Sequence, residues 1–108
     1  MSGHNDDAVK ALQQQLIEFA TARNWGRYHS PKNLSMALSV EVAELLEHFQ
    51  WMTEAESFSL NAEVQAQVQD EVADVLLYLL QICNQLKIDP IDAATSKLEK
   101  NAIKYPAL

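Results

Sequence analysis

Turn-forming residues are scarce in this chain, which has two glycines and three prolines among its 108 residues. No segment shows the alternation of apolar and polar residues that is typical of a half-buried strand. Apolar residues recur instead at helical spacing, as in the stretch from Asp7 to Arg23. The sequence therefore predicts an all-α fold.

Long apolar runs and paired cysteines are also missing. No apolar run approaches the length of about 18 residues that suggests a membrane helix, and residues 1–10 lack the apolar core of a signal peptide, so we expect no membrane contact. Cys83 is the only cysteine, which fits a reducing, cytoplasmic setting. With 48% apolar residues, we expect one globular domain over residues 1–108, in which residues 1–7 form a disordered tail.

Positive charge is absent from the middle of the chain. Residues 33–86 contain no Lys or Arg, although the same span holds nine acids. The net charge of −7 leaves no basic surface to meet a phosphate backbone, which argues against binding to a nucleic acid polymer. The central acids also have few cationic side chains nearby in sequence with which to pair.

Helix-start signals divide the chain into four helices. Ser30 followed by Pro31, and Asp89 followed by Pro90, both fit an N-cap residue with proline at the first helical position. We expect helices over about 7–23, 31–52, 62–87 and 90–105, with a linker over 53–61. Four helices with short connections favour an antiparallel four-helix bundle, and the small size of the domain favours an oligomer.

Two acidic stretches of the same form lie inside predicted helices: EVAELLEHFQW begins at Glu41, and EVADVLLYLL begins at Glu71. Each places two acids three residues apart, Glu41 with Glu44 and Glu71 with Asp74, at roughly 60° on the helix surface. Glu41 and Glu71 each share a face with an apolar stripe. If the two helices pack along these stripes, all four carboxylates converge.

Convergence of four ionised carboxylates is costly, because each loses hydration and repels the others. Either some of the acids stay protonated or a divalent cation binds. An oxygen-only ligand set, without His or Cys, favours Mg²⁺ or Mn²⁺. The alternative is an ordinary solvated helix face, since Glu is a good helix former and acids at this spacing are common.

The acidic pattern, E-x-x-E followed after 26 residues by E-x-x-D, resembles that of the MazG-like, all-α nucleoside triphosphate pyrophosphohydrolases. Further blocks are similar to the dCTP pyrophosphatase branch of that family. They are RNWGRYHSPKNL, EHFQW, DVLLYLL and SKLEKNAIKYP, and the likeness covers roughly residues 12–108. The resemblance implies a Mg²⁺-dependent enzyme that cleaves a nucleoside triphosphate to the monophosphate and pyrophosphate, and it implies a homodimer or homotetramer.

The resemblance also implies roles for particular residues. Glu41, Glu44, Glu71 and Asp74 would be metal ligands, and Trp25, His29, Trp51 and Tyr78 match positions that line the nucleoside pocket in relatives. Leu16 stands where some relatives have a histidine that meets the nucleotide. This departure leaves the preferred base open, and pyrimidine triphosphates such as dCTP are the leading expectation.

Other roles follow from the residues themselves. Glu41 or Glu44 could act as the general base, and the sequence does not choose between them. Lys97 and Asn101 share a face of the last helix and could carry triphosphate charge, unless the lysine only complements the helix dipole. Asn33, at a helix start, could meet phosphate oxygens or simply cap the helix. A non-catalytic interaction module, such as an antitoxin-like bundle, is the alternative function.

Overall fold

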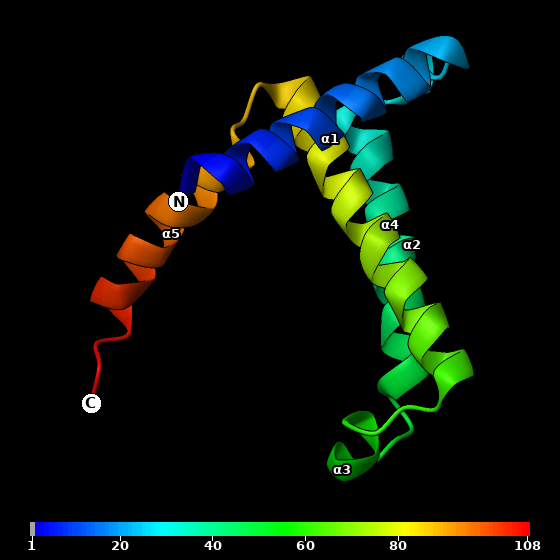
Figure 1. Cartoon of the computed structure of the whole chain (residues 1–108), viewed down its shortest axis with the longest axis vertical. Coiled ribbons are helices and arrows are strands. Elements are labelled where there is room, and N and C mark those ends of the chain that lie inside the picture. Colours follow the sequence, from blue (N-terminus) through cyan, green and yellow to red (C-terminus); the bar gives the residue numbers. More distant parts are fainter. Residues whose placement is uncertain (1) are drawn as a thin grey trace.

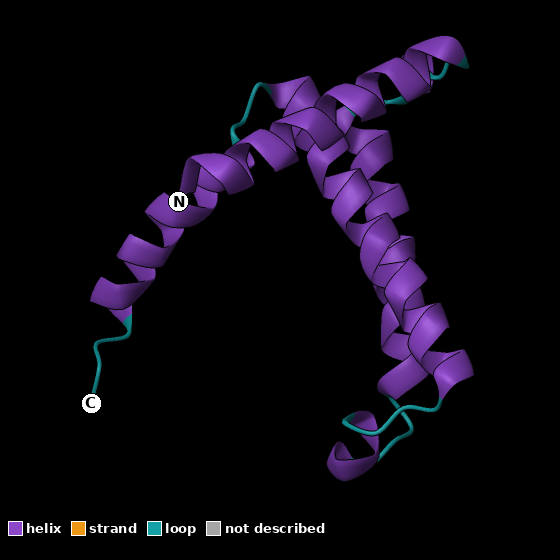
Figure 2. Ribbon diagram, viewed as in Figure 1, coloured by secondary structure: helices purple, strands orange, loops and turns teal. Residues whose placement is uncertain are grey.

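The computed structural model describes residues 2–108, and it describes side chains from Ala8 onward. The elements are α1 (Ser2–Ala22), a short 3-10 turn η1 (Gly26–Tyr28), α2 (Pro31–Phe49), α3 (Glu54–Ser57), α4 (Ala62–Leu86) and α5 (Pro90–Lys104) (Figures 1 and 2). Within residues 2–108 every regular element is helical, so the all-α prediction is confirmed. Among these helices, none combines the length and apolar character needed to cross a bilayer.

The two predicted proline-led helix starts are present. The Ser30 hydroxyl accepts a hydrogen bond from the backbone N–H of Asn33 at 3.0 Å, and the Asp89 carboxylate accepts from the N–H groups of Ile91 and Asp92, each at 3.0 Å. Each cap satisfies donors that a helix N-terminus leaves without an intrahelical partner. These caps fix where α2 and α5 begin.

Three bounds differ from those predicted. The first helix begins at Ser2, inside the segment expected to form a disordered tail, and Met1 lies outside the described residues. The second helix ends at Phe49, because Thr53 starts a new turn with Glu56 in a reciprocal capping box. The expected linker therefore contains the one-turn helix α3. At the end of α4, Lys87 adopts a left-handed conformation with φ 58°, which stops the helix.

An antiparallel hairpin of α2 and α4 forms the main body of the chain, and α1 crosses α4 at the open end of that hairpin, far from α3 (Figure 1). Gln13 of α1 and Asn84 of α4 exchange two hydrogen bonds, at 2.9 and 3.2 Å, which fix this crossing. The most deeply buried apolar side chains, Leu34 and Leu80, are 2% and 3% exposed and lie at the same end of the hairpin. The packed core is therefore small and lies where α1 meets the hairpin.

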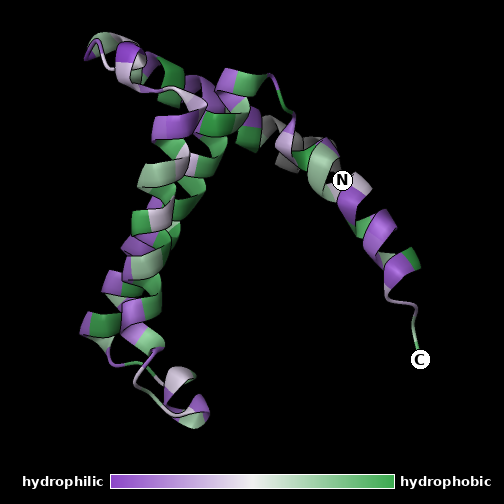
Figure 3. Ribbon diagram, turned by 180° about the vertical axis from the view of Figure 1, so that it is seen from behind, coloured by the Kyte–Doolittle hydropathy of each residue, from purple (hydrophilic) through white to green (hydrophobic). Residues whose placement is uncertain are grey.

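The predicted four-helix bundle is not closed within one chain. After Asp89, α5 diverges from the hairpin and makes only sparse contact with the other helices (Figure 1). The radius of gyration is 16.6 Å, against about 13 Å for a compact domain of this length. A short connection keeps α5 close to the end of α4, but it does not force α5 to pack against the hairpin. The hydropathy colouring shows apolar segments along the hairpin and on α5 (Figure 3).

Candidate active site

Three of the four predicted acids meet between α2 and α4. Carboxylate oxygens of Glu41, Glu44 and Glu71 all lie within 4.8 Å of one another. The Oε2 atoms of Glu41 and Glu71 are closed off from solvent and have no hydrogen-bond partner in the protein. The i, i+3 spacing and the antiparallel packing of the two helices produce this convergence, as the sequence predicts.

The electrostatics of the cluster favour a neutral acid at Glu41. Burial raises the pKa of Glu41 from 4.5 to about 7, and the neighbouring carboxyl of Glu71 and the charges of Glu44 and Asp74 add to the shift. Burial also raises the pKa of Glu71, although the neighbouring carboxyl of Glu41 opposes that rise. Near neutral pH the two inner carboxyls can therefore hold a proton that a cation would displace.

The cluster fits a hard divalent cation. Its ligand atoms are all carboxylate oxygens, two of these oxygens have no hydrogen-bond partner, and residues 33–86 contain no Lys or Arg. Such a set suits Mg²⁺ or Mn²⁺ better than a soft metal. Asp74 is outside the group of three, but its charge contributes to the raised pKa of both Glu41 and Glu71. It therefore borders the cluster.

A cavity of about 310 Å³ adjoins the cluster on the α1 side. Asp74 lines this cavity, and so do the predicted residues Trp25, His29 and Tyr78. Asp74 precedes Tyr78 by one helical turn on α4, so one face of that helix runs from the acids into the cavity. The structure therefore brings these four residues together around one cavity.

Aromatic rings in edge-to-face contact build one wall of this aromatic cavity. Trp25 meets Phe19 edge-on, with ring centroids 5.6 Å apart, and its ring centroid lies 6.4 Å from that of His29. The Arg23 guanidinium lies 3.5 Å from the Phe19 ring centroid and donates to the Phe19 carbonyl at 3.1 Å. Cation–π contact and ring packing hold the indole in place. Sequence reasoning missed Phe19, whose place in the apolar stripe of α1 suggested only core packing.

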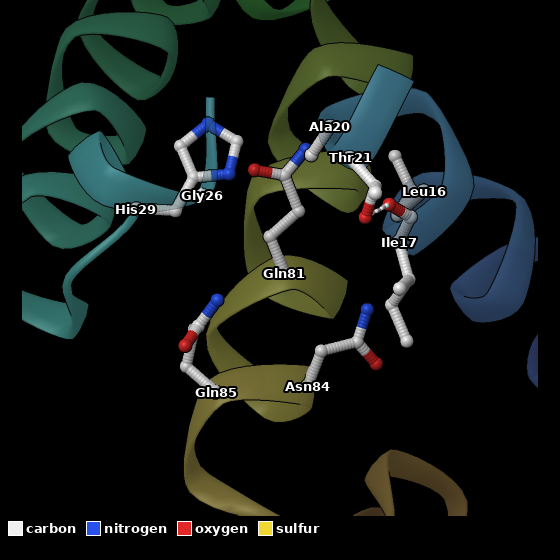
Figure 4. Close-up of a pocket in the computed structure, with 9 residues that line it drawn as sticks. All are labelled: Leu16, Ile17, Ala20, Thr21, Gly26, His29, Gln81, Asn84 and Gln85. Carbon is white, nitrogen blue, oxygen red and sulfur yellow. Dashed lines mark hydrogen bonds between the residues drawn. The ribbon is translucent and has the colours of Figure 1, made fainter. Parts of the chain in front are cut away.

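A second, smaller cavity of about 100 Å³ lies beside the aromatic one and shares Leu16, His29 and Gln81 with it. Figure 4 shows that the Gln81 side chain extends between His29 and the α1 residue Ala20. The Oε1 atom of Gln81 is closed off from solvent without a hydrogen-bond partner. Gln81 was missed in the sequence, because a glutamine on a helix is ordinarily a surface residue.

A separate acidic hollow of about 440 Å³ adjoins the cluster and opens to solvent. Glu44 and Glu71 line it together with Glu47, which the motif suggested only as an outer acid, and Asp70. Glu44 and Glu71 therefore border a hollow in which a metal and a phosphate chain have room, although the Oε2 atom of Glu71 itself is closed off from solvent.

Four predicted substrate-binding residues lie apart from this arrangement. Trp51 is 88% exposed and follows the end of α2, near the tip of the hairpin that carries α3. Lys97 and Asn101 lie on the diverging helix α5. The Asn33 side chain donates to the Tyr28 carbonyl at 3.0 Å, which ties the start of α2 to the preceding turn, whereas Ser30 caps the helix. Their roles toward a substrate remain predictions.

Comparison with known proteins decides the family. The model of the MazG-like family matches residues 36–108. The chain belongs to the MazG-like family. This MazG-like chain is 40% identical over 104 residues to dCTP pyrophosphatase 1 of Homo sapiens and 40% identical over 103 residues to that of Rattus norvegicus, covering 94% of the chain and 61% of each relative. It thus spans about three fifths of the length of these curated relatives.

The fold of this chain is also similar to that of a solved structure. A crystal structure of a pyrophosphatase from Archaeoglobus fulgidus superposes with a TM-score of 0.85 and is 46% identical. The match covers 91% of this chain and 92% of that one. The diverging arrangement of α5 and the hairpin therefore belongs to a fold that this solved pyrophosphatase shares over nearly its whole length.

Proposed function

We propose that the chain is a nucleoside triphosphate pyrophosphohydrolase that depends on Mg²⁺. The observation that carries this proposal is the pair of closed-off carboxylate oxygens of Glu41 and Glu71, which lack donors beside an aromatic cavity that shares Asp74 with the acid cluster. A binding module without catalytic function has no need for this costly arrangement. The names of the relatives, dCTP pyrophosphatase 1 and pyrophosphatase, agree with the proposal.

In this proposal Glu41, Glu44, Glu71 and Asp74 hold the metal. A Mg²⁺ ion held there would supply charge neutralisation at the phosphates and would lower the pKa of water. A carboxylate that is left free by the metal accepts the proton of that water, and Glu41 or Glu44 serves as this base. One water molecule is consumed, one phosphoanhydride bond breaks, and the products are the nucleoside monophosphate and pyrophosphate.

The aromatic cavity takes the nucleoside in this proposal. Trp25 and His29 face the base, since each stacked aromatic face contributes about 1–3 kcal/mol. Tyr78 lies between the base and the acids, one turn from Asp74, where its hydroxyl can reach the sugar or a phosphate. We propose pyrimidine deoxynucleotides such as dCTP as substrates and removal of unwanted nucleotides from the pool as the role, in the cytoplasm that the single cysteine suggests.

We also propose that the enzyme is a homo-oligomer, a dimer or tetramer. The chain exposes 8405 Å², whereas a compact monomer of 12.2 kDa exposes about 6,000 Å². The excess is larger than the area of about 800 Å² that each partner buries in a standard interface. Much of it is apolar surface on the hairpin, contributed by Val42, Leu46, Val72, Leu76 and Leu79.

Two such hairpins placed face to face would complete the four-helix bundle that one chain leaves open. The same assembly gives Trp51, Lys97 and Asn101 a route to a substrate, because each can approach the site of another copy. Lys97 and Asn101 would then meet the triphosphate, and Asn33 would present a helix N-terminus to it.

A pyrophosphate-release assay with dNTPs and Mg²⁺ tests the proposed function. We expect turnover that disappears in Glu41→Gln while the variant stays folded, because the change removes one charge from a repulsive cluster. Glu18→Gln is the matched control, since Glu18 lies on α1 outside the cluster and its carboxylate meets only Gln14. Absence of turnover in the parent, or equal turnover in Glu41→Gln, would leave the non-catalytic, antitoxin-like module as the better reading.

A further inference from the structure

The aromatic cavity has few groups that can distinguish one base from another. Its walls are largely aromatic or aliphatic, and Asp74 lies at the end that adjoins the acid cluster. Two polar side chains lie farther from the acids. His29 is in edge-to-face contact with Trp25, and Gln81 contributes a side-chain amide. Stacking rings accept every base, because each base has a flat face. Discrimination therefore requires hydrogen bonds at the far end.

Gln81 is suited to supply such a hydrogen bond. It lies one turn beyond Tyr78 on α4, on the face that runs from Asp74 into the cavity, and it lines both cavities. Its Oε1 atom is enclosed and lacks a donor, which is costly for a carbonyl oxygen that gives up water. The terminal torsion of glutamine is broad, so a small turn of the amide presents this oxygen to the cavity.

We propose that Gln81 is a specificity-determining residue, whose carbonyl accepts a hydrogen bond from the exocyclic amino group of the base. The inference rests on the proposed function, because it assumes that a nucleotide occupies the aromatic cavity. The exocyclic group opposite the sugar reaches deepest into such a cavity. It is an amino group in cytosine and adenine, and a keto oxygen in uracil and hypoxanthine. Gln81 therefore selects amino bases over their keto counterparts.

Two substrate pairs test this selection: dCTP against dUTP, and dATP against dITP. Within each pair the bases differ in the amino or keto group and in the adjacent ring nitrogen, which carries a hydrogen in the keto base alone. For the parent we expect kcat/KM to favour the amino member by about tenfold in each pair, as the loss of one buried hydrogen bond implies. In Gln81→Met, which keeps the length of the side chain and loses the acceptor, we expect both ratios to fall close to one. Gln81→Glu keeps acceptor oxygens and should keep both preferences.

Gln85→Met is the matched control. Gln85 lies one turn farther along α4 and lines the small cavity but not the aromatic one, so its replacement should leave both ratios unchanged. A parent that hydrolyses dNTPs without an amino preference, or a Gln81→Met enzyme that retains it, would overturn the assignment. A purely structural Gln81 would lower the melting temperature and leave the ratios alone. A parent that hydrolyses no dNTP would refute the proposed function instead.

Discussion

Magnesium should stabilise the folded protein, and it should do so far less at low pH. A metal that binds only the folded state raises the free energy of unfolding by about 2.7 kcal/mol at a concentration 100 times its dissociation constant. With an unfolding entropy of about 2.1 cal/mol/K per residue, a chain of 108 residues should then melt about 12 °C higher. We expect this shift at pH 8 in a thermal melt with excess Mg²⁺.

The pH dependence follows from Glu41, whose pKa is raised to about 7. The carboxyl must lose its proton to bind the metal, so going from pH 8 to pH 6 lowers the ionised fraction and the apparent affinity about tenfold. A factor of ten corresponds to about 1.4 kcal/mol, and at fixed Mg²⁺ the shift should shrink by roughly 6 °C.

Without metal, the stability of the folded protein should change with pH in the opposite direction. Because folding raises the pKa of Glu41, its contribution to stability is present below about 4.5, its ordinary pKa, and is lost as the pH rises through about 7. The metal-free protein should therefore melt lower at pH 8 than at pH 5. Glu41→Gln should flatten both profiles, and Glu18→Gln should change neither. Magnesium shifts that are equal at pH 6 and pH 8, or equal in Glu41→Gln and the parent, would refute the reasoning.

Two further predictions concern assembly and the residues far from the acids. Sedimentation equilibrium should give a multiple of 12.2 kDa, because the exposed hairpin needs a partner, and a monomer at micromolar concentration would contradict this. Trp51→Ala should weaken nucleotide binding far more than Mg²⁺ binding, measured by calorimetry, and equal losses would indicate a packing role. If Trp51 acts across chains, mixing inactive Trp51→Ala with inactive Glu41→Gln should restore up to about a quarter of parent activity in a dimer, whereas separately acting chains would restore none.

Local features of the fold were predictable from the sequence. The starts of α2 and α5 were recognisable because Ser30 with Pro31, and Asp89 with Pro90, satisfy backbone donors within three residues. The meeting of Glu41 with Glu71 was predictable because helical periodicity places both on apolar stripes that must pack. The caps depend on residues that are close together in the sequence. The meeting of the acids depends on a single long-range contact, the packing of two long helices.

Features that depend on long-range packing were not predictable in the same way. The direction of α5 is set by what covers its apolar face, and the connection at Lys87 and Asp89 leaves that direction open. Phe19 and Gln81 belong to the cavity only because α1 crosses α4 at the Gln13–Asn84 contact. The sequence shows an aromatic ring and an amide at these positions, but not that a loop and two helices enclose a space between them.

The position of Asp74 has a consequence for how the two halves of the site respond to each other. Its carboxylate borders the acid cluster and also forms part of the cavity wall. A cation that draws the Asp74 side chain toward α2 would change the shape of the aromatic cavity. A ligand bound in that cavity would in turn change the position of the Asp74 carboxylate relative to the cation. Thermodynamic reciprocity then requires each ligand to change the affinity of the other by the same factor, so a single carboxylate would make the chain respond to its two ligands jointly.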